Sequence, residues 1–123
     1  MRRKYIICFD LDNVICVTKS NNYKFSKPKK KVIKIINNLY RKGFIIKIFT
    51  SRFMGRNNEN ARVAKKLGFN LTKNQLKKWK INYHILIMGK PSYDILIDDK
   101  ALGFKSNWYN SFNINKYFSR NKI

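Results

Sequence analysis

The sequence predicts an α/β protein of one domain with a mostly parallel sheet. Short apolar segments typical of buried strands alternate along the chain with segments whose apolar residues recur at helical spacing. The 123 residues are 44% hydrophobic and 15% aromatic, which is enough for one core and too little for a second. We therefore expect residues 1–123 to form a single domain. Its aromatic-rich tail, 103–123, is expected to pack on the core as a helix or an edge strand.

The first half of the chain is expected to contribute two strands and one helix. Residues Tyr5–Phe9 are apolar without alternation, as in a strand that is covered on both faces. A polar loop follows over 13–27, with a small hairpin flap as one alternative. A helix is expected to begin near Pro28 and to stop before Gly43. The second strand is expected over Phe44–Phe49.

The second half is expected to contribute two helices and two strands. The first helix covers about 57–67, and a glycine follows it. A separate helix is expected after it, because Thr72 and Gln75 have the spacing of a capping box. Strands are expected over Ile85–Met88 and Ile95–Ile97, with a glycine- and proline-containing turn between them.

The few acidic residues of the chain are clustered. Six Asp and Glu stand against 28 Lys and Arg, and four of the six form two pairs, Asp10 with Asp12 and Asp98 with Asp99. Each pair directly follows a predicted strand. Grouped carboxylates repel one another, so a fold tolerates them best around a cation such as Mg²⁺. Taken singly, each could also cap a helix or stabilise a turn.

Other polar residues lie at the ends of the remaining strands. Thr50 and Ser51 follow the second strand, and Lys90 follows the third. Parallel sheets bind ligands at the carboxyl ends of their strands, where these residues would meet the aspartates. Lys90 alone means little among many lysines, so the hypothesis rests on the order and co-location of all these groups.

The segments FDLDNV, IFTSR, GKP and LIDD resemble, in order and spacing, the four motifs of the haloacid dehalogenase superfamily of phosphohydrolases. The resemblance covers residues 5–102. The stretch 71–102 is also similar to small bacterial members that are often associated with capsule or surface-sugar biosynthesis. The resemblance implies a three-layer α/β/α, Rossmann-like fold with a mostly parallel sheet. The gaps between the motifs leave no room for a cap domain.

The resemblance also implies a role for each motif residue. Asp10 would be the nucleophile that forms an aspartyl phosphate, and Asp12 would be the acid and base. Thr50, Ser51 and Lys90 would bind the transferring phosphoryl group. A Mg²⁺ ion would be bound by the set Asp10, Asp12, Asp98 and Asp99. Asp12 would reach it through its backbone carbonyl, and Asp99 would bind it through water or would hold Lys90.

The first motif departs from the commonest form of the superfamily at two positions. Asn13 and Val14 stand where glycine and threonine are usual, and neither change removes a catalytic group. Asn13 can adopt the left-handed backbone that glycine would supply. Arg52 and Arg56 follow the second motif closely and are candidates for substrate specificity.

The resulting hypothesis is a Mg²⁺-dependent phosphatase of a sugar phosphate or similar metabolite. Its open site implies either a large substrate or a neighbouring subunit that covers it. The net charge of +22 leaves two less favoured alternatives, a phosphatase of nucleic-acid ends and a non-catalytic nucleic-acid-binding protein on the same scaffold. The chain has no signal peptide or membrane-length apolar run, so a cytoplasmic location is expected.

Overall fold

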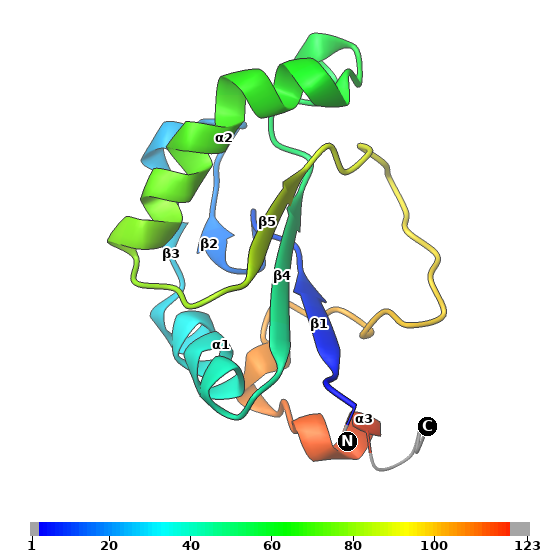
Figure 1. Cartoon of the computed structure of the whole chain (residues 1–123). Coiled ribbons are helices and arrows are strands. Elements are labelled where there is room, and N and C mark those ends of the chain that lie inside the picture. Colours follow the sequence, from blue (N-terminus) through cyan, green and yellow to red (C-terminus); the bar gives the residue numbers. More distant parts are fainter. Residues whose placement is uncertain (1–2, 119–123) are drawn as a thin grey trace.

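The computed structural model describes residues 3–118 and has an α/β fold built on a three-stranded parallel sheet (Figure 1). The strands are β1 (Ile6–Phe9), β4 (Ile45–Thr50) and β5 (Ile85–Met88), with β4 in the centre. Both pairings are parallel. The predicted α/β class with a parallel sheet is confirmed, and so are these three strands. Their shared direction brings the three carboxyl ends to one edge of the sheet.

Two long helices pack on one side of this sheet, as Figure 1 shows. Helix α1 (Lys30–Arg41) buries residues that recur at helical spacing, namely Val32, Ile33, Ile36 and Leu39. It ends before Gly43, as predicted, and this glycine has the positive φ of +95° that follows many helices. Its start is two residues later than expected, because Pro28 pairs with Cys16 in a short strand instead.

Helix α2 (Ala61–Lys78) is continuous, so the prediction of two separate helices was wrong. The true N-cap is Asn60, whose side chain accepts a hydrogen bond from the Val63 N–H at 3.1 Å. Thr72 and Gln75 are not a capping box. They lie one turn apart on the inner face of α2, and Thr72 is fully buried.

The glycine inside α2 is required by a close neighbour. A methyl group on Gly68 would meet the ring of Phe53 and would lie 3.1 Å from Met88 Cε. Phe53 has a positive φ of 67°, so its backbone is already in a conformation that side chains rarely adopt. The helix therefore passes through Gly68 because no larger residue fits there.

Replacing Gly68 by alanine is expected to destabilise the protein by about 1–3 kcal/mol, because the overpacking outweighs the helix propensity of about 1 kcal/mol that alanine adds. Urea unfolding measures this difference. The matched control is Gly103→Ala, at a position with nothing within 4 Å. A Gly68→Ala variant more stable than the parent protein would contradict this packing.

The face of the sheet opposite the helices is only partly covered. Ile6 is 52% exposed and Cys8 is also exposed, so the expectation that the first strand is covered on both faces was wrong. The predicted strand at Ile95–Ile97 is absent, and its end residues are 77% and 93% exposed. Figure 1 shows this segment in a long loop away from the sheet. Within residues 3–118, the two long helices therefore form one layer rather than two.

The segment between β1 and α1 forms the flap that was one alternative for it. Strands β2 (Cys16–Val17) and β3 (Lys27–Pro28) pair in antiparallel fashion, and the one-turn helix η1 (Tyr23–Phe25) lies between them. Asn21 supplies a positive φ of 57° near the tip. The hairpin is thus closed by local backbone geometry.

The described part of the tail is helical rather than an edge strand. It contains η3 (Trp108–Asn110) and α3 (Ile114–Phe118), and residues 119–123 of the predicted tail lie outside the described residues. Trp108 is buried, and its ring centroid is 6.3 Å from that of Phe9. A further one-turn helix, η2 (Gly55–Asn57), follows β4. Across residues 3–118, none of the helices has the length and apolar character needed to cross a bilayer.

Candidate active site

Asp10 and Lys90 face each other at the carboxyl edge of the sheet. Asp10 follows β1, and its Oδ1 lies 3.6 Å from Lys90 Nζ. The same oxygen accepts a hydrogen bond from the Leu11 N–H at 2.8 Å. The Asp10 side chain is 37% exposed, whereas that of Lys90 is only 11% exposed. A solvent-accessible carboxylate is therefore held beside a mostly buried ammonium group.

The surroundings alter the proton affinity of both groups. Burial raises the pKa of Asp10 above its ordinary value, although Lys90 and the Leu11 N–H counteract this. Burial lowers the pKa of Lys90, but the Tyr93 hydroxyl and Asp10 outweigh that effect and raise it overall. Lys90 therefore stays charged beside the carboxylate.

Asp12 is held by a different and stronger partner. Arg52 Nε donates to Asp12 Oδ1 at 3.1 Å and to Oδ2 at 3.0 Å, and Arg52 Nη2 donates to Oδ1 at 2.9 Å. The Thr18 hydroxyl also donates to Oδ1, at 2.5 Å. The Arg52 side chain is 0% exposed and that of Asp12 is 21% exposed. This bidentate pair fixes the orientation of the carboxylate.

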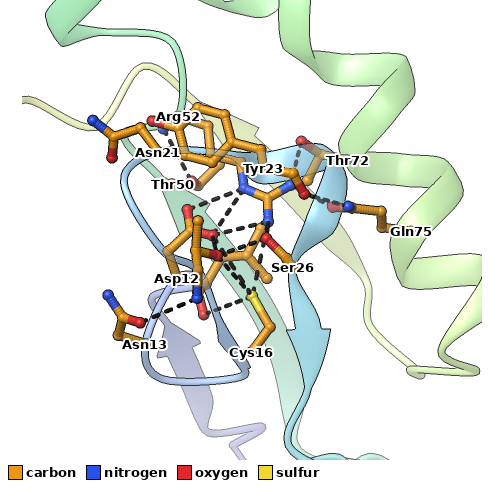
Figure 2. A network of polar contacts seen from close by, with 12 residues as sticks. Asp12, Asn13, Cys16, Asn21, Tyr23, Ser26, Thr50, Arg52, Thr72 and Gln75 are labelled. Carbon is orange, nitrogen blue, oxygen red and sulfur yellow. Dashed lines mark hydrogen bonds and ion pairs between the residues drawn. The ribbon is translucent and has the colours of Figure 1, made fainter.

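Arg52 joins three parts of the fold, as Figure 2 shows. Its Nη1 donates to Gln75 Oε1 at 2.5 Å and to Thr72 Oγ1 at 3.3 Å, both on α2. Its Nη2 also donates to Ser26 Oγ at 3.1 Å, on the flap. The guanidinium lies 4.9 Å from the ring centroid of Tyr23. Every nitrogen of this buried cation has a polar partner, as a buried charge requires.

The flap cysteine, Cys16, belongs to the same cluster but is chemically inert. Cys16 Sγ lies 3.6 Å from Asp12 Oδ1 and accepts from Arg52 Nη2 at 3.8 Å. Burial, with the charge of Asp12 beside it, raises the pKa of Cys16 to about 11. The thiol is therefore protonated near neutral pH and donates to the carboxylate instead of acting as a nucleophile.

The segment after β4 connects the two aspartates. Thr50 is buried, and its Oγ1 accepts a hydrogen bond from the Arg52 N–H at 3.1 Å. Its carbonyl accepts from the Lys90 N–H, also at 3.1 Å. Ser51 follows Thr50 and is partly exposed. Lys90 thus contacts both Asp10 and Thr50, and Arg52 links Thr50 to Asp12.

The second acidic pair is not part of this cluster. Asp98 and Asp99 lie in the exposed loop after Lys90, and Asp98 Oδ1 accepts from the Lys100 N–H at 2.8 Å. Among residues 3–118, no three side chains of His, Cys, Asp or Glu are grouped so that they could hold one metal ion. The described residues therefore match the expected magnesium site only in part. Of the four expected residues, Asp10 and Asp12 lie at the carboxyl edge of the sheet, and Asp98 and Asp99 do not.

The two arginine candidates for specificity lie in different environments. Arg52 is buried and fully engaged, so its place is behind Asp12 rather than at the surface. Arg56 is exposed; its Nη2 donates to the Asn21 carbonyl at 2.9 Å, and its guanidinium lies 5.1 Å from the Tyr23 ring. Only Arg56 keeps a position from which it could contact a substrate.

Sequence reasoning missed the residues that hold Arg52. Thr72 and Gln75 were visible as polar residues three apart, but their spacing also fits a capping box, which was preferred. The available signal was that these two polar residues lie on the face of α2 that otherwise packs inward, which indicates a buried polar partner. Asn13, in contrast, has the predicted left-handed backbone, with φ 65°.

The arrangement pairs an accessible carboxylate with a restrained one at the end of a sheet. Asp10 presents a partly exposed carboxylate beside the Lys90 ammonium group, which suits attack on an electrophile that carries negative charge. Asp12 Oδ2 accepts only from Arg52 Nε among the described contacts, so it retains a lone pair that can take a proton.

Comparisons with known proteins place the fold but no family. No family model matches the chain, and no curated protein matches it. The structure is similar to the crystal structure of a target protein from Vibrio cholerae, with a TM-score of 0.83 and 22% identity over 97% of this chain and 99% of that one. It is also similar to a chain of the Pnkp1/Rnl/Hen1 RNA repair complex, with a TM-score of 0.50 and 17% identity over 98% of this chain and 32% of that one. At these identities the likeness establishes a shared fold alone.

Proposed function

We propose that the protein is a phosphomonoester hydrolase of the haloacid dehalogenase type that works through an aspartyl phosphate on Asp10. The observation that carries the proposal is the accessible Asp10 carboxylate, 3.6 Å from Lys90 Nζ, at the carboxyl edge of a parallel sheet. The four sequence motifs support the same chemistry, and membership of that superfamily, without a cap domain, belongs to this proposal.

In the first step an Asp10 carboxylate oxygen attacks the phosphorus of the ester. An O–P bond forms to Asp10 and the O–P bond to the leaving group breaks. Lys90 offsets the repulsion between the carboxylate and the phosphate dianion. The Thr50 hydroxyl already accepts from the Arg52 N–H, so its own proton is free to be donated to a phosphoryl oxygen.

Asp12 carries the proton in both steps of the proposal. The reacting form of the enzyme carries a proton on Asp12 Oδ2, and this proton passes to the leaving oxygen in the first step. In the second step a water attacks phosphorus, the same Oδ2 takes the proton of that water, and the bond to Asp10 breaks to release phosphate. Arg52 keeps this oxygen in one position throughout, since it holds both carboxylate oxygens.

A magnesium ion is part of the proposal, held by Asp10 and the Asp12 carbonyl together with Asp98 and Asp99. When bound, it would neutralise charge on the phosphoryl group. Asp98 and Asp99 must approach Asp10 before the set is complete, because they lie outside the cluster around it. Two features favour such a movement: β1 is an edge strand, and the apolar run Ile95–Ile97 that precedes Asp98 is exposed.

Hydrolysis of para-nitrophenyl phosphate tests the proposed activity. We expect turnover with Mg²⁺ and its loss in EDTA. A chain that hydrolyses the ester equally well in both conditions is not the enzyme proposed here.

Hydrogen exchange tests the magnesium site separately from activity. We expect Mg²⁺ to slow amide exchange over residues 95–99, because binding would draw Asp98 and Asp99 toward Asp10 and order the run before them. Asp98→Asn/Asp99→Asn should abolish this protection, whereas the control Asp94→Asn, on the same loop, should keep it. Unchanged exchange in the parent protein at a saturating Mg²⁺ concentration would show that these carboxylates do not join the site.

The substrate has two candidates. A sugar phosphate or similar metabolite is the first, from the narrower sequence resemblance. The end of a nucleic acid is the second, which the net charge of +22 supports, and the fold is shared with a chain of an RNA repair complex.

A further inference from the structure

The flap hairpin has two faces of different character. Thr18 and Ser26 point inward, where their hydroxyl oxygens lie 2.6 Å apart and bond to Asp12 and Arg52 respectively. The outer face lines a cavity of about 370 Å³. Two apolar residues, two lysines and one asparagine line it, namely Val17, Phe25, Lys19, Lys27 and Asn22. The hairpin thus separates the acidic cluster from a basic, partly aromatic hollow.

Phe25 is the main apolar residue of this outer face and is 74% exposed. The backbone that carries it is held in a turn, because the Phe25 N–H donates to the Asn22 carbonyl at 3.0 Å and the Ser26 N–H donates to the Tyr23 carbonyl at 3.1 Å. With the backbone held, only the two side-chain torsions of Phe25 have to be ordered when a flat ligand stacks on its ring. Val17, 42% exposed, extends the apolar floor beside it.

The charge around Phe25 has one sign. Six lysines occur within residues 19–31, and the chain has no acidic residue between Asp12 and Glu59. Lys19 and Lys27, which line the cavity with Phe25, are exposed. Phosphates of a polyanion can therefore approach from the outside without meeting a carboxylate, since Asp12 faces inward.

An exposed aromatic ring among cations fits a single-stranded nucleic acid. Such strands are bound by basic grooves that follow the backbone and by aromatic side chains on which bases stack. A duplex hides its base faces and cannot use Phe25 in this way. A small sugar phosphate has only one phosphate for several lysines.

We propose that the outer face of the flap hairpin binds a single-stranded nucleic acid, with a base stacked on Phe25 and backbone phosphates beside Lys19 and Lys27. The proposal rests on the proposed function and names its substrate class: the phosphate at the end of the strand reaches Asp10. The two faces belong to one short hairpin, because Thr18 on its inner side contacts Asp12 while its neighbours Val17 and Lys19 belong to the outer face. A strand bound on the outer face would therefore pass the edge of the hairpin to bring its terminal phosphate to Asp10.

Fluorescence anisotropy with labelled single strands of about 12 nucleotides tests the binding surface, in DNA and RNA arms. We expect Phe25→Ala to weaken binding about tenfold in at least one arm, as the loss of one stacked base does. The matched control is Phe104→Ala, which removes another exposed phenylalanine, 54% exposed, far along the chain. It should bind as the parent protein does.

The lysines are tested by the salt dependence of the same binding. Lys19→Gln/Lys27→Gln should reduce the slope of log affinity against log salt by about 1.4, because single strands give about 0.7 for each phosphate contact. Lys66→Gln/Lys73→Gln removes the same charge from exposed positions on α2 and should leave the slope unchanged.

The outcomes separate this inference from the proposed function. Phe25→Ala should still hydrolyse para-nitrophenyl phosphate at the parental rate, and it should raise the KM for an oligonucleotide with a terminal phosphate. If the Phe25→Ala and Phe104→Ala variants bind the single strands equally well, the proposed binding surface is wrong, even if the ester is hydrolysed. The surface is also overturned if Phe25→Ala weakens binding to anionic lipid vesicles but not to single strands, because the face would then be a membrane contact. If the parent protein does not hydrolyse the ester but binds single strands in a way that depends on Phe25, the proposed activity is wrong and the proposed binding surface is kept.

Discussion

Asp10→Asn is expected to lower the rate of phosphate-ester hydrolysis by on the order of 10⁴-fold or more, as the loss of a nucleophile does in other enzymes. The amide has no negative charge and cannot form the acyl phosphate. The fold should persist, because the Asp10 side chain is 37% exposed and its polar contacts are those to Leu11 and Lys90. Steady-state turnover of para-nitrophenyl phosphate measures the effect.

A matched control uses an acidic residue of the same loop region as Lys90. Asp94→Asn makes the identical chemical change at an exposed position and should leave the rate unchanged. Urea unfolding of both variants checks that neither has lost its fold. Equal rates for Asp10→Asn and Asp94→Asn would remove Asp10 from the chemistry.

Asp12→Ala is expected to reduce the free energy of unfolding by about 3–5 kcal/mol, because it leaves the Arg52 guanidinium buried without its anion. Arg52 has 0% exposure and cannot reach water as a surface arginine would. The midpoint of urea unfolding, followed by tryptophan fluorescence, should fall while the slope of the transition is kept.

The control and the rescue for this prediction are both available in the chain. Asp98→Ala removes an exposed carboxylate and should change stability by no more than about 0.5 kcal/mol. Asp12→Ala/Arg52→Met should be more stable than Asp12→Ala alone, since an apolar side chain then replaces the unpaired cation. If Asp12→Ala is as stable as Asp98→Ala, the pair with Arg52 does not hold the site.

The strands were predictable because their signal is local. The apolar runs that became β1, β4 and β5 need only their own composition to be recognised. The break expected at Gly68 was wrong because the reason for that glycine is Phe53, which lies far from it in sequence. The run Ile95–Ile97 has the composition of a strand but no strand pairing within the described residues. Strand propensity alone does not create a partner.

The candidate site divides in the same way. The proximity of Asp10, Thr50 and Lys90 could be anticipated, because parallel strands bring their carboxyl ends together. The burial of Arg52 could not, since it depends on Thr72 and Gln75 from a helix twenty residues and more along the chain. A charged residue directly after a motif is more often at the surface, and only tertiary packing reverses that expectation.

The most direct test of the central claim is to trap the phosphorylated enzyme. A phosphate ester is mixed with the protein in Mg²⁺, the reaction is quenched in acid, and the peptides are mapped by mass spectrometry. We predict a phosphoryl group on Asp10 in the parent protein and none in the Asp10→Asn variant. Turnover with the phosphoryl group on a different residue, or sustained turnover by Asp10→Asn, would contradict the assignment of Asp10 as nucleophile.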